Sequence, residues 1–267
     1  MRPSAAAVLA ASVLALALAS LPFGALEGQA ASARDTVHVT VGSAAVNGHV
    51  YKEHAARVRV IRDGADGVQA EWTNVLTLGD SAGRPVQRWV TTGKRKTPDG
   101  KEVAWEIRQN YDAVTLAPYS YWRTSGDGAE LRLVIDGPRI RGTRRAPGGA
   151  EAPVSIDLPG AAFMANASDL VPPAVGMKAG TVMTAPMWDP GSNQYRVSVF
   201  IVLPERTIDV EGTPWKAWPV EERMRDGGAL VATWYMTDRS PYMLAGEVPL
   251  PNGVMQRMTE IAVPMPR

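Results

Sequence analysis

Residues 102–108 read Glu-Val-Ala-Trp-Glu-Ile-Arg, and this stretch decides the fold class. The large apolar residues Val103, Trp105 and Ile107 occupy every second position, so an extended chain places them on one face and the charged residues on the other. One packed face and one hydrated face are typical of a strand in an antiparallel sheet. The stretch therefore predicts a half-buried β-strand.

The same alternation recurs at residues 57–60, 131–135 and 195–200, and residues 73–78 and 86–91 are also expected to be strands. Short turn signals separate these segments, among them Asp63-Gly64, Asp99-Gly100, Asp136-Gly137 and Asn252-Gly253. Asp-Gly and Asn-Gly pairs accept the positive φ that tight hairpins require. We therefore expect a mainly β protein in which successive hairpins build one large antiparallel sheet.

One segment departs from this alternation. Residues 158–178 include an Ala-Ala-Phe-Met-Ala run that predicts one short helix, ended before Pro172-Pro173. The preceding residues 142–153 are rich in Arg, Gly and Pro and are expected to form a loop. Residues 105–119 and 218–242 share a short pattern, in which a tryptophan is followed by an aspartate and then by a Pro-Tyr pair. This similarity predicts two similar halves joined around residues 142–180.

Residues 1–33 have the features of an export signal. Arg2 precedes a long run of Ala, Val and Leu, and Ala31-Ser32-Ala33 offers small residues for cleavage. The apolar run is short for a bilayer-spanning helix of about 20 residues, so a retained anchor is the weaker alternative. We expect a cleaved signal peptide, then a single β-rich domain over residues 34–267 with no transmembrane span. The expected location is the periplasm, or the extracellular space if the host lacks an outer membrane.

The composition narrows the chemistry that the chain can perform. It has no cysteine, and its three histidines all lie before residue 55, which excludes thiolate metal sites and disfavours histidine-based catalysis. A net charge of +1 gives no long-range attraction for nucleic acid. We expect no metal, no cofactor, no nucleic-acid partner and no enzymatic activity.

Residues 79–83 read Gly-Asp-Ser-Ala-Gly and fit the G-x-S-x-G motif of esterases and lipases. That motif requires the serine on a strand-to-helix turn and a histidine later in the chain. No histidine follows Ser81, and residues 85–90 have the pattern of a strand. The expected structure is a turn between two strands, and an esterase using Ser81 is the remote alternative.

Tryptophan outnumbers phenylalanine, 8 to 3, and methionine is frequent at 11. Indole rings can line an apolar ligand cavity, and methionine adapts to irregular apolar shapes. We name Trp105, Trp122, Trp218 and Trp234 as candidate ligand-binding residues. The competing interpretation is that these rings fill the core.

Basic residues gather at Lys94-Arg95-Lys96 and at positions 139, 141, 144 and 145, which are all arginine. Such groups could meet phosphate or an anionic lipid head group. The competing interpretation is a set of hydrated hairpin tips.

Three segments carry a resemblance to a known family. They are residues 110–119 (NYDAVTLAPY), residues 169–180 (DLVPPAVGMKAG) and residues 215–221 (WKAWPVE), the last leading to Trp234-Tyr235 and Pro241-Tyr242. Over roughly residues 55–265 the chain resembles a family of exported bacterial proteins of unknown function, whose domain is similar to the periplasmic carriers of outer-membrane lipoproteins. The resemblance implies a curved antiparallel sheet, or half-barrel, with one short helix, and a periplasmic, non-enzymatic role. It transfers no functional residue.

We therefore expect a non-enzymatic exported protein of the cell envelope. Its concave sheet face is expected to bind an apolar, lipid-like ligand or an envelope protein as partner. The alternative is a purely structural or interaction module whose core is filled.

Overall fold

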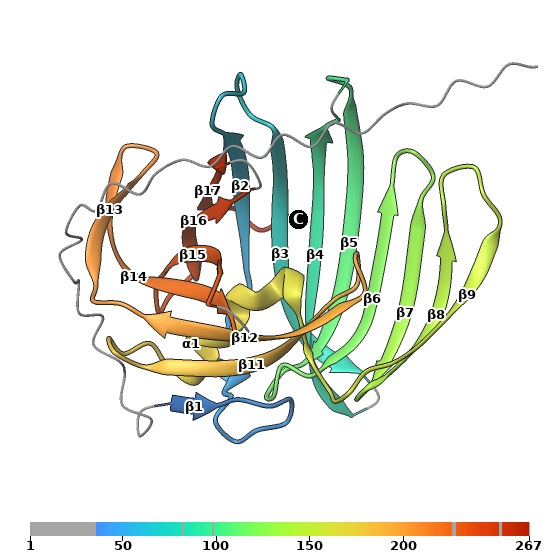
Figure 1. The fold of residues 1–267 in the computed structure, drawn as a ribbon, viewed down its shortest axis with the longest axis horizontal. Coiled ribbons are helices and arrows are strands. Elements are labelled where there is room, and N and C mark those ends of the chain that lie inside the picture. Colours follow the sequence, from blue (N-terminus) through green and yellow to red (C-terminus); the bar gives the residue numbers. More distant parts are fainter. Residues whose placement is uncertain (1–35, 82, 98, 226–227, 251–252, 267) are drawn as a thin grey trace, which may run out of the picture. The chain divides into compact units, whose positions relative to one another are not determined.

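The computed structural model describes residues 36–266 except residues 82, 98, 226–227 and 251–252. Within this part of the chain the strands belong to one sheet of 17 strands, accompanied by short helical segments (Figure 1). Nearly all neighbouring strands are antiparallel. The predicted fold class, a mainly β protein with a large antiparallel sheet and a short helix, is confirmed.

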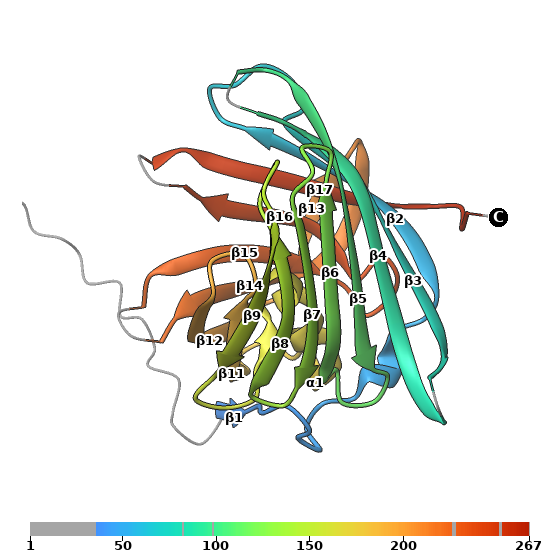
Figure 2. The same ribbon diagram turned by 90° about the vertical axis from the view of Figure 1, so that its right-hand side faces the viewer.

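The first half of the sheet is a meander of consecutive strands, each paired with the next (Figure 2). Its strands are β2 (His54–Arg62), β3 (Ala70–Ser81), β4 (Arg84–Lys96), β5 (Glu102–Asp112), β6 (Pro118–Ser125), β7 (Glu130–Asp136), β8 (Arg139–Arg145) and β9 (Glu151–Asp157). The alternating segments predicted before residue 140 lie in these strands, and residues 195–200 lie in β12 (Gln194–Val202) of the second half. The hairpin turns between them carry glycines with positive φ, such as Gly100 and Gly137.

The second half follows the same meander with one addition. Its strands are β11 (Val182–Asp189), β12 (Gln194–Val202), β13 (Arg206–Val210), β14 (Thr213–Met224), β15 (Leu230–Met236), β16 (Met243–Pro249) and β17 (Met255–Val263). The long strand β14 pairs with β13 along its first part and with β12 along its second part. The β13–β14 hairpin therefore branches away from the main sheet.

The two halves are joined by antiparallel pairing of β17 with β2, from Gln256 opposite Arg62 to Val263 opposite Ala55. One edge of the sheet is β9. At the other edge the short strands β1 (Thr36–His38) and β10 (Phe163–Met164) add in parallel to β11. No pairing between described residues links these two edges, so the sheet stays open.

The helical segment lies between β10 and β11 on one face of the sheet, which we call the concave face (Figure 1). It consists of a 3₁₀ turn, η3 (Ala165–Leu170), followed by α1 (Val171–Val175). The sequence predicted that the helix ends before Pro172-Pro173, and this is wrong, because both prolines lie in the first turn of α1. Proline is accepted there because the first N–H groups of a helix have no intrahelical partner. The helix ends instead at Gly176, whose φ is 108°.

The predicted loop over residues 142–153 is also wrong. Strand β8 continues to Arg145, β9 starts at Glu151, and only the turn between them is irregular. Gly142 explains part of the error. A Cβ at Gly142 would lie 1.9 Å from the carbonyl oxygen of Arg132, so the close approach of β7 and β8 requires glycine inside the strand.

The core forms where the helical segment and the chain before β2 cover the concave face. Tyr51, just after the 3₁₀ turn η2 (Gly48–Val50), is buried and donates its hydroxyl to the carbonyl oxygen of Leu170 at 2.5 Å. The buried amide of Gln87 donates to the carbonyl oxygen of Gly48 at 2.8 Å. These contacts bind η2 and η3 to the inner ends of β3–β8, where Leu76, Tyr111 and many other apolar side chains are buried.

The predicted signal peptide over residues 1–33 lies outside the described residues. The single domain over residues 34–267 and its similar halves stay predictions. In the part of the chain that the structure describes, every helical segment falls short of the length and hydropathy that crossing a bilayer demands.

Gly48 provides a test of the packing between η2 and the sheet. A Cβ at this position would lie 2.3 Å from the carbonyl oxygen of Ala113, a backbone atom that cannot move freely. We expect Gly48→Ala to lower the free energy of unfolding by about 1–3 kcal/mol, the usual cost of overpacking. Chemical denaturation measures this change.

Gly126→Ala is the matched control. The nearest atom to its Cβ would be the carbonyl oxygen of Ala104 at 3.4 Å, an ordinary contact. If both variants lowered the free energy of unfolding equally, the tight contact that we assign between Gly48 and the backbone of Ala113 would be contradicted.

Candidate ligand site on the concave face

One row of the sheet carries two tryptophans onto the concave face. Strand register places Val58, Trp72, Gly93, Trp105 and Ser125 directly opposite one another across β2–β6. Residues paired in this way project to the same face. Val58 is fully buried in the apolar cluster of β2 and β17, so the row belongs to the inner surface.

Trp72 and Trp105 meet across the glycine between them. Their ring centroids are 5.8 Å apart, with the planes inclined at 57°. A Cβ on Gly93 would lie 2.4 Å from the Cβ of Trp72, so any other residue there would push the two strands or the two rings apart. The pair is an aromatic contact of the kind that stabilises neighbouring strands.

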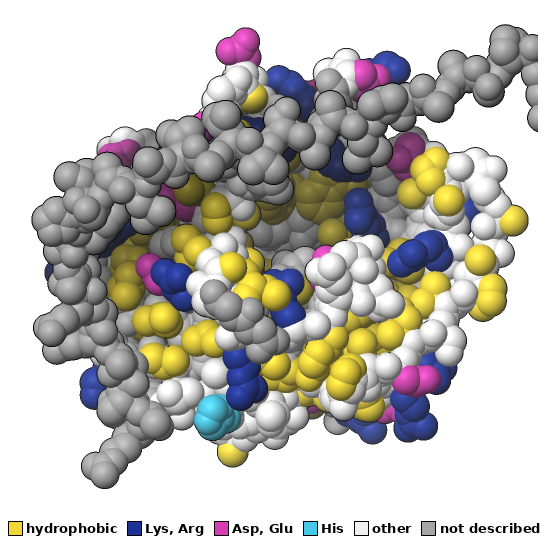
Figure 3. All heavy atoms as spheres, viewed as in Figure 1, with side chains coloured by type: hydrophobic (Ala, Val, Ile, Leu, Met, Phe, Trp, Pro, Cys, Tyr) yellow, Lys and Arg dark blue, Asp and Glu magenta, His cyan; other side chains and the backbone are white. Residues whose placement is uncertain are grey.

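A cavity of about 220 Å³ opens beside these two rings. Its apolar walls come from Ala70, Trp72, Trp105 and Ile107, and its polar margin comes from Arg95 and Arg123. Figure 3 shows hydrophobic side chains inside a hollow on this side of the molecule, with basic side chains near its margin. Trp72 and Trp105 are only partly buried, in contrast to the apolar residues that pack on η3 and α1.

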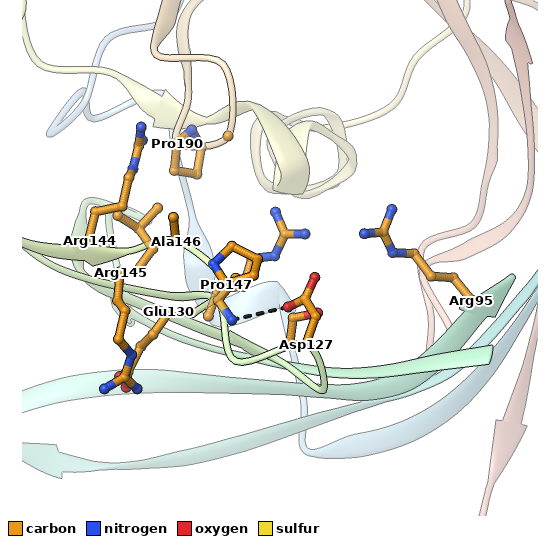
Figure 4. Close-up of a pocket in the computed structure, with 13 residues that line it drawn as sticks. Arg95, Asp127, Glu130, Arg144, Arg145, Ala146, Pro147 and Pro190 are labelled. Atoms are coloured by element: carbon orange, nitrogen blue, oxygen red, sulfur yellow. Dashed lines mark hydrogen bonds and ion pairs between the residues drawn. The ribbon is translucent and has the colours of Figure 1, made fainter. Parts of the chain in front are cut away.

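A second cavity, of about 330 Å³, adjoins the first and shares Arg95 and Arg123 with it. Its other lining residues include Asp127, Glu130 and Arg144 from the β6–β8 side. Pro190 and Gly191 line it from the turn between β11 and β12. Figure 4 shows Arg95 and Asp127 on one side of this space and Arg144 on the side of Pro190. The second cavity is therefore bounded by both halves of the sheet.

The structure places three of the four predicted tryptophans on the concave face. Trp105 lines the first cavity. Trp218 and Trp234 lie on β14 and β15, where both pack against the main core. Trp234 also contacts the apolar cluster around Val58, which Trp72 contacts from the other side. The indoles thus lie along one apolar surface, with Trp105 at the open cavity and Trp218 and Trp234 nearer the filled part.

Trp122 lies on the opposite, convex face, so its prediction as a concave-face residue is wrong. It is paired with Arg108 and Arg132, and the Arg108 guanidinium lies 4.6 Å from its ring centroid. Its indole nitrogen donates to Glu130 Oε1 at 2.7 Å. The adjacent Tyr121 takes the inner position, where it is buried. Whether any of the four tryptophans binds a ligand stays a prediction.

Sequence reasoning missed Trp72, Ile107 and Arg123 as members of the site. Ile107 could have been predicted from the sequence, because it lies two residues after Trp105 and therefore on the same face of the strand. Trp72 joins the site only through the pairing of β3, β4 and β5, which no local pattern encodes.

Buried polar groups lie deeper on the concave face, under η3. Glu222 on β14 is fully buried and accepts hydrogen bonds from the hydroxyls of Ser168 and Ser198, both at 2.8 Å. Arg196 Nη2 pairs with the same carboxylate at 3.1 Å. The indole of Trp234 donates to it at 3.1 Å. The buried ion pair between Glu222 and Arg196 therefore fixes the position of the Trp234 indole. This arrangement suits Trp234 to a structural role in the core.

Two further carboxyl groups in this region have raised pKa values. Burial raises the pKa of Glu260 to about 8, with nearby Asp169 adding to the rise and a hydrogen bond with Asn74 opposing it. Burial also raises the pKa of Asp169 to about 6, and Glu222 adds to that rise. The folded protein thus favours the neutral form of both groups.

This arrangement predicts how stability depends on pH. The folded state holds the proton of Glu260 more tightly than the unfolded chain, so the contribution of Glu260 to stability is complete below its ordinary pKa of 4.5 and is lost as pH rises toward about 8. We expect Glu260→Gln to remove this decline and to be more stable than wild type at pH 8 by roughly 1–3 kcal/mol. Denaturant unfolding at pH 5, 6.5 and 8 measures the difference.

Glu102→Gln serves as the control, because the Glu102 side chain is 53% exposed in a surface pair with Lys94. It is expected to follow the wild-type pH profile. A Glu260→Gln profile parallel to wild type would contradict a raised pKa at Glu260.

Ser81 does not occupy a nucleophile elbow. It is the exposed last residue of β3 and pairs with Arg84, the first residue of β4, across a hairpin. The expected turn between two strands is thus found, and the strand-to-helix corner needed for esterase chemistry is absent at this position.

Comparisons with known proteins place the chain in a family. A crystal structure described as a beta-barrel-like protein of the domain of unknown function DUF1849 from Brucella abortus has a TM-score of 0.49 and 10% sequence identity, covering 80% of this chain and 98% of that chain. No curated protein matches the chain. The expected membership of a family of unknown function is confirmed, whereas the matches described here include no lipoprotein carrier. Residues 65–259 match the family described as "Protein of unknown function (DUF3108)", and the chain belongs to this family.

Proposed function

We propose that this protein is a non-enzymatic exported protein of the cell envelope that holds an apolar, lipid-like ligand on its concave face. The observation that carries the proposal is the cavity walled by Trp72, Trp105 and Ile107 beside the filled core. Export, in this proposal, rests on the expected signal peptide.

The physical basis of this proposal is that some apolar surface on the concave face is still partly exposed to water. Covering such surface gains about 25 cal/mol per Å², or about 0.8 kcal/mol per buried methylene. A cavity of about 220 Å³ is smaller than typical drug-sized pockets of roughly 300–1,000 Å³. A single acyl chain, or the end of one, is the ligand portion that fits this space.

The alternative of an interaction module with a filled core has less support. It would pair a partner with an exposed edge such as β9. That strand contains Pro153 and charged residues at both ends, features that protect an edge from strand addition. The remote esterase alternative has no support from the position of Ser81 in a β-hairpin.

Binding of the neutral fluorophore N-phenyl-1-naphthylamine tests the proposal. We expect saturable binding to the wild-type protein and about tenfold weaker binding to Trp105→Ala, because losing one aromatic wall costs on the order of 1–2 kcal/mol. A fluorescence titration measures both dissociation constants.

Trp215→Ala removes the same side chain from β14, at a position that lines neither cavity, and is the matched control. It is expected to bind the fluorophore with the wild-type affinity. Absence of saturable binding to wild type, or equal weakening by the two variants, would overturn the proposal. Thermal unfolding of each variant verifies that it is folded.

A further inference from the structure

We propose that the ligand of the concave face is an anionic amphiphile whose head group binds Arg95, Arg123 and Arg144. This inference rests on the proposed function and specifies the chemistry of its ligand. The acyl part would lie against Trp72 and Trp105, and the anionic end would lie in the adjoining cavity.

The three arginines come from different strands but reach the same cavity. Arg123 is opposite Ile107 on one side and Leu131 on the other, and Leu131 is opposite Arg144. This row lies on the face of Ile107 and therefore on the concave side. Arg95 is near the end of β4 and lines both cavities.

The connection between the two cavities favours an elongated ligand with two chemically different ends. Arg95 and Arg123 are common to both linings. The first cavity, on one side of these arginines, is lined by Trp72, Trp105 and Ile107. The second cavity, on the other side, is polar and is also lined by Arg144. A molecule extending through both spaces meets apolar walls first and guanidinium groups second.

In the part of the chain that the structure describes, these three arginines form no ion pair, although Arg95 lies close enough to Asp127 to help lower the pKa of that carboxyl group. Among the described residues, none has a carboxylate oxygen within 4.0 Å of Arg95, Arg123 or Arg144. Arg123 is partly buried, so its charge has lost part of its hydration. An anion from the ligand would replace that hydration with charge-assisted hydrogen bonds.

The carboxylates that line the same cavity do not neutralise this charge. Glu130 is already bound to Arg132 at 2.6 Å and Arg145 at 2.7 Å, and it also accepts the Trp122 indole. Asp127 accepts the backbone N–H of Ala129 at 3.0 Å. One remaining carboxylate faces three guanidinium groups, so the space favours an anion over a cation.

Guanidinium groups match the geometry of phosphate and carboxylate because they donate two parallel hydrogen bonds. A phosphate or carboxylate on a single chain therefore fits the two cavities together. Free inorganic phosphate has the same charge chemistry but leaves the apolar walls uncovered.

Displacement of N-phenyl-1-naphthylamine by three competitors tests the inference on the full protein. The competitors are dodecyl phosphate, 1-dodecanol and inorganic phosphate, each below its aggregation limit. We expect dodecyl phosphate to displace the probe at about tenfold lower concentration than dodecanol, the effect of one or two charge-assisted hydrogen bonds. Inorganic phosphate is expected to displace nothing at those concentrations.

Arg123→Gln and Arg144→Gln are both expected to remove most of the preference for dodecyl phosphate. Arg144 lines only the second cavity, so Arg144→Gln is also expected to leave dodecanol binding unchanged. Arg144 is exposed, so its variant guards against a folding defect in the partly buried Arg123 variant. Arg139→Gln removes an exposed arginine whose side chain is 67% exposed and lines neither cavity, and it is the matched control. It should keep the full preference.

The outcomes separate this inference from the proposed function. Equal displacement by dodecyl phosphate and dodecanol would overturn the anionic head group and leave apolar binding intact. No displacement by either amphiphile, with no probe binding, would overturn both. Inorganic phosphate acting as well as dodecyl phosphate, or Arg139→Gln losing the preference, would also overturn the inference.

Discussion

The structure depends on covering the concave face of an open sheet with residues of the same chain. The short segment η3–α1 and the residues around Tyr51 do this for the inner ends of β3–β8, and the hydrogen bond from Tyr51 to Leu170 joins the two covering pieces. This cover is too small for a sheet of such width. Apolar surface therefore remains partly exposed beside Trp72 and Trp105, and this is the surface on which we propose that the ligand binds.

Local patterns in the sequence predicted the fold class and several of the strands, but not which side chains share a face of the sheet. Alternation identified β5 correctly because Trp105 and Ile107 occupy a regular period of two. It failed for Trp122, because the adjacent Tyr121 is equally apolar and local pattern alone does not say which of the two faces inward. The contact between Trp72 and Trp105 depends on two strand pairings and on Gly93, which are long-range properties.

Proline and glycine caused the other errors for a shared reason. Each residue type has several structural uses, and a sequence pattern does not show which use applies. Pro172 and Pro173 start α1, although proline more often follows a helix end. Gly142 lies inside a strand because β7 passes close to it, although glycine in an Arg- and Pro-rich stretch resembles a loop.

The pairing of β17 with β2 has a consequence for how the chain reaches its folded state. These strands lie in the middle of the sheet, yet nearly the whole sequence separates them. During synthesis, which starts at the N-terminal end, the first meander would be complete long before β17 was made. Until then the β2 side of that meander would be an unpaired edge. Assembly is thus a late event that couples both halves, and long-range closure of this kind is slow.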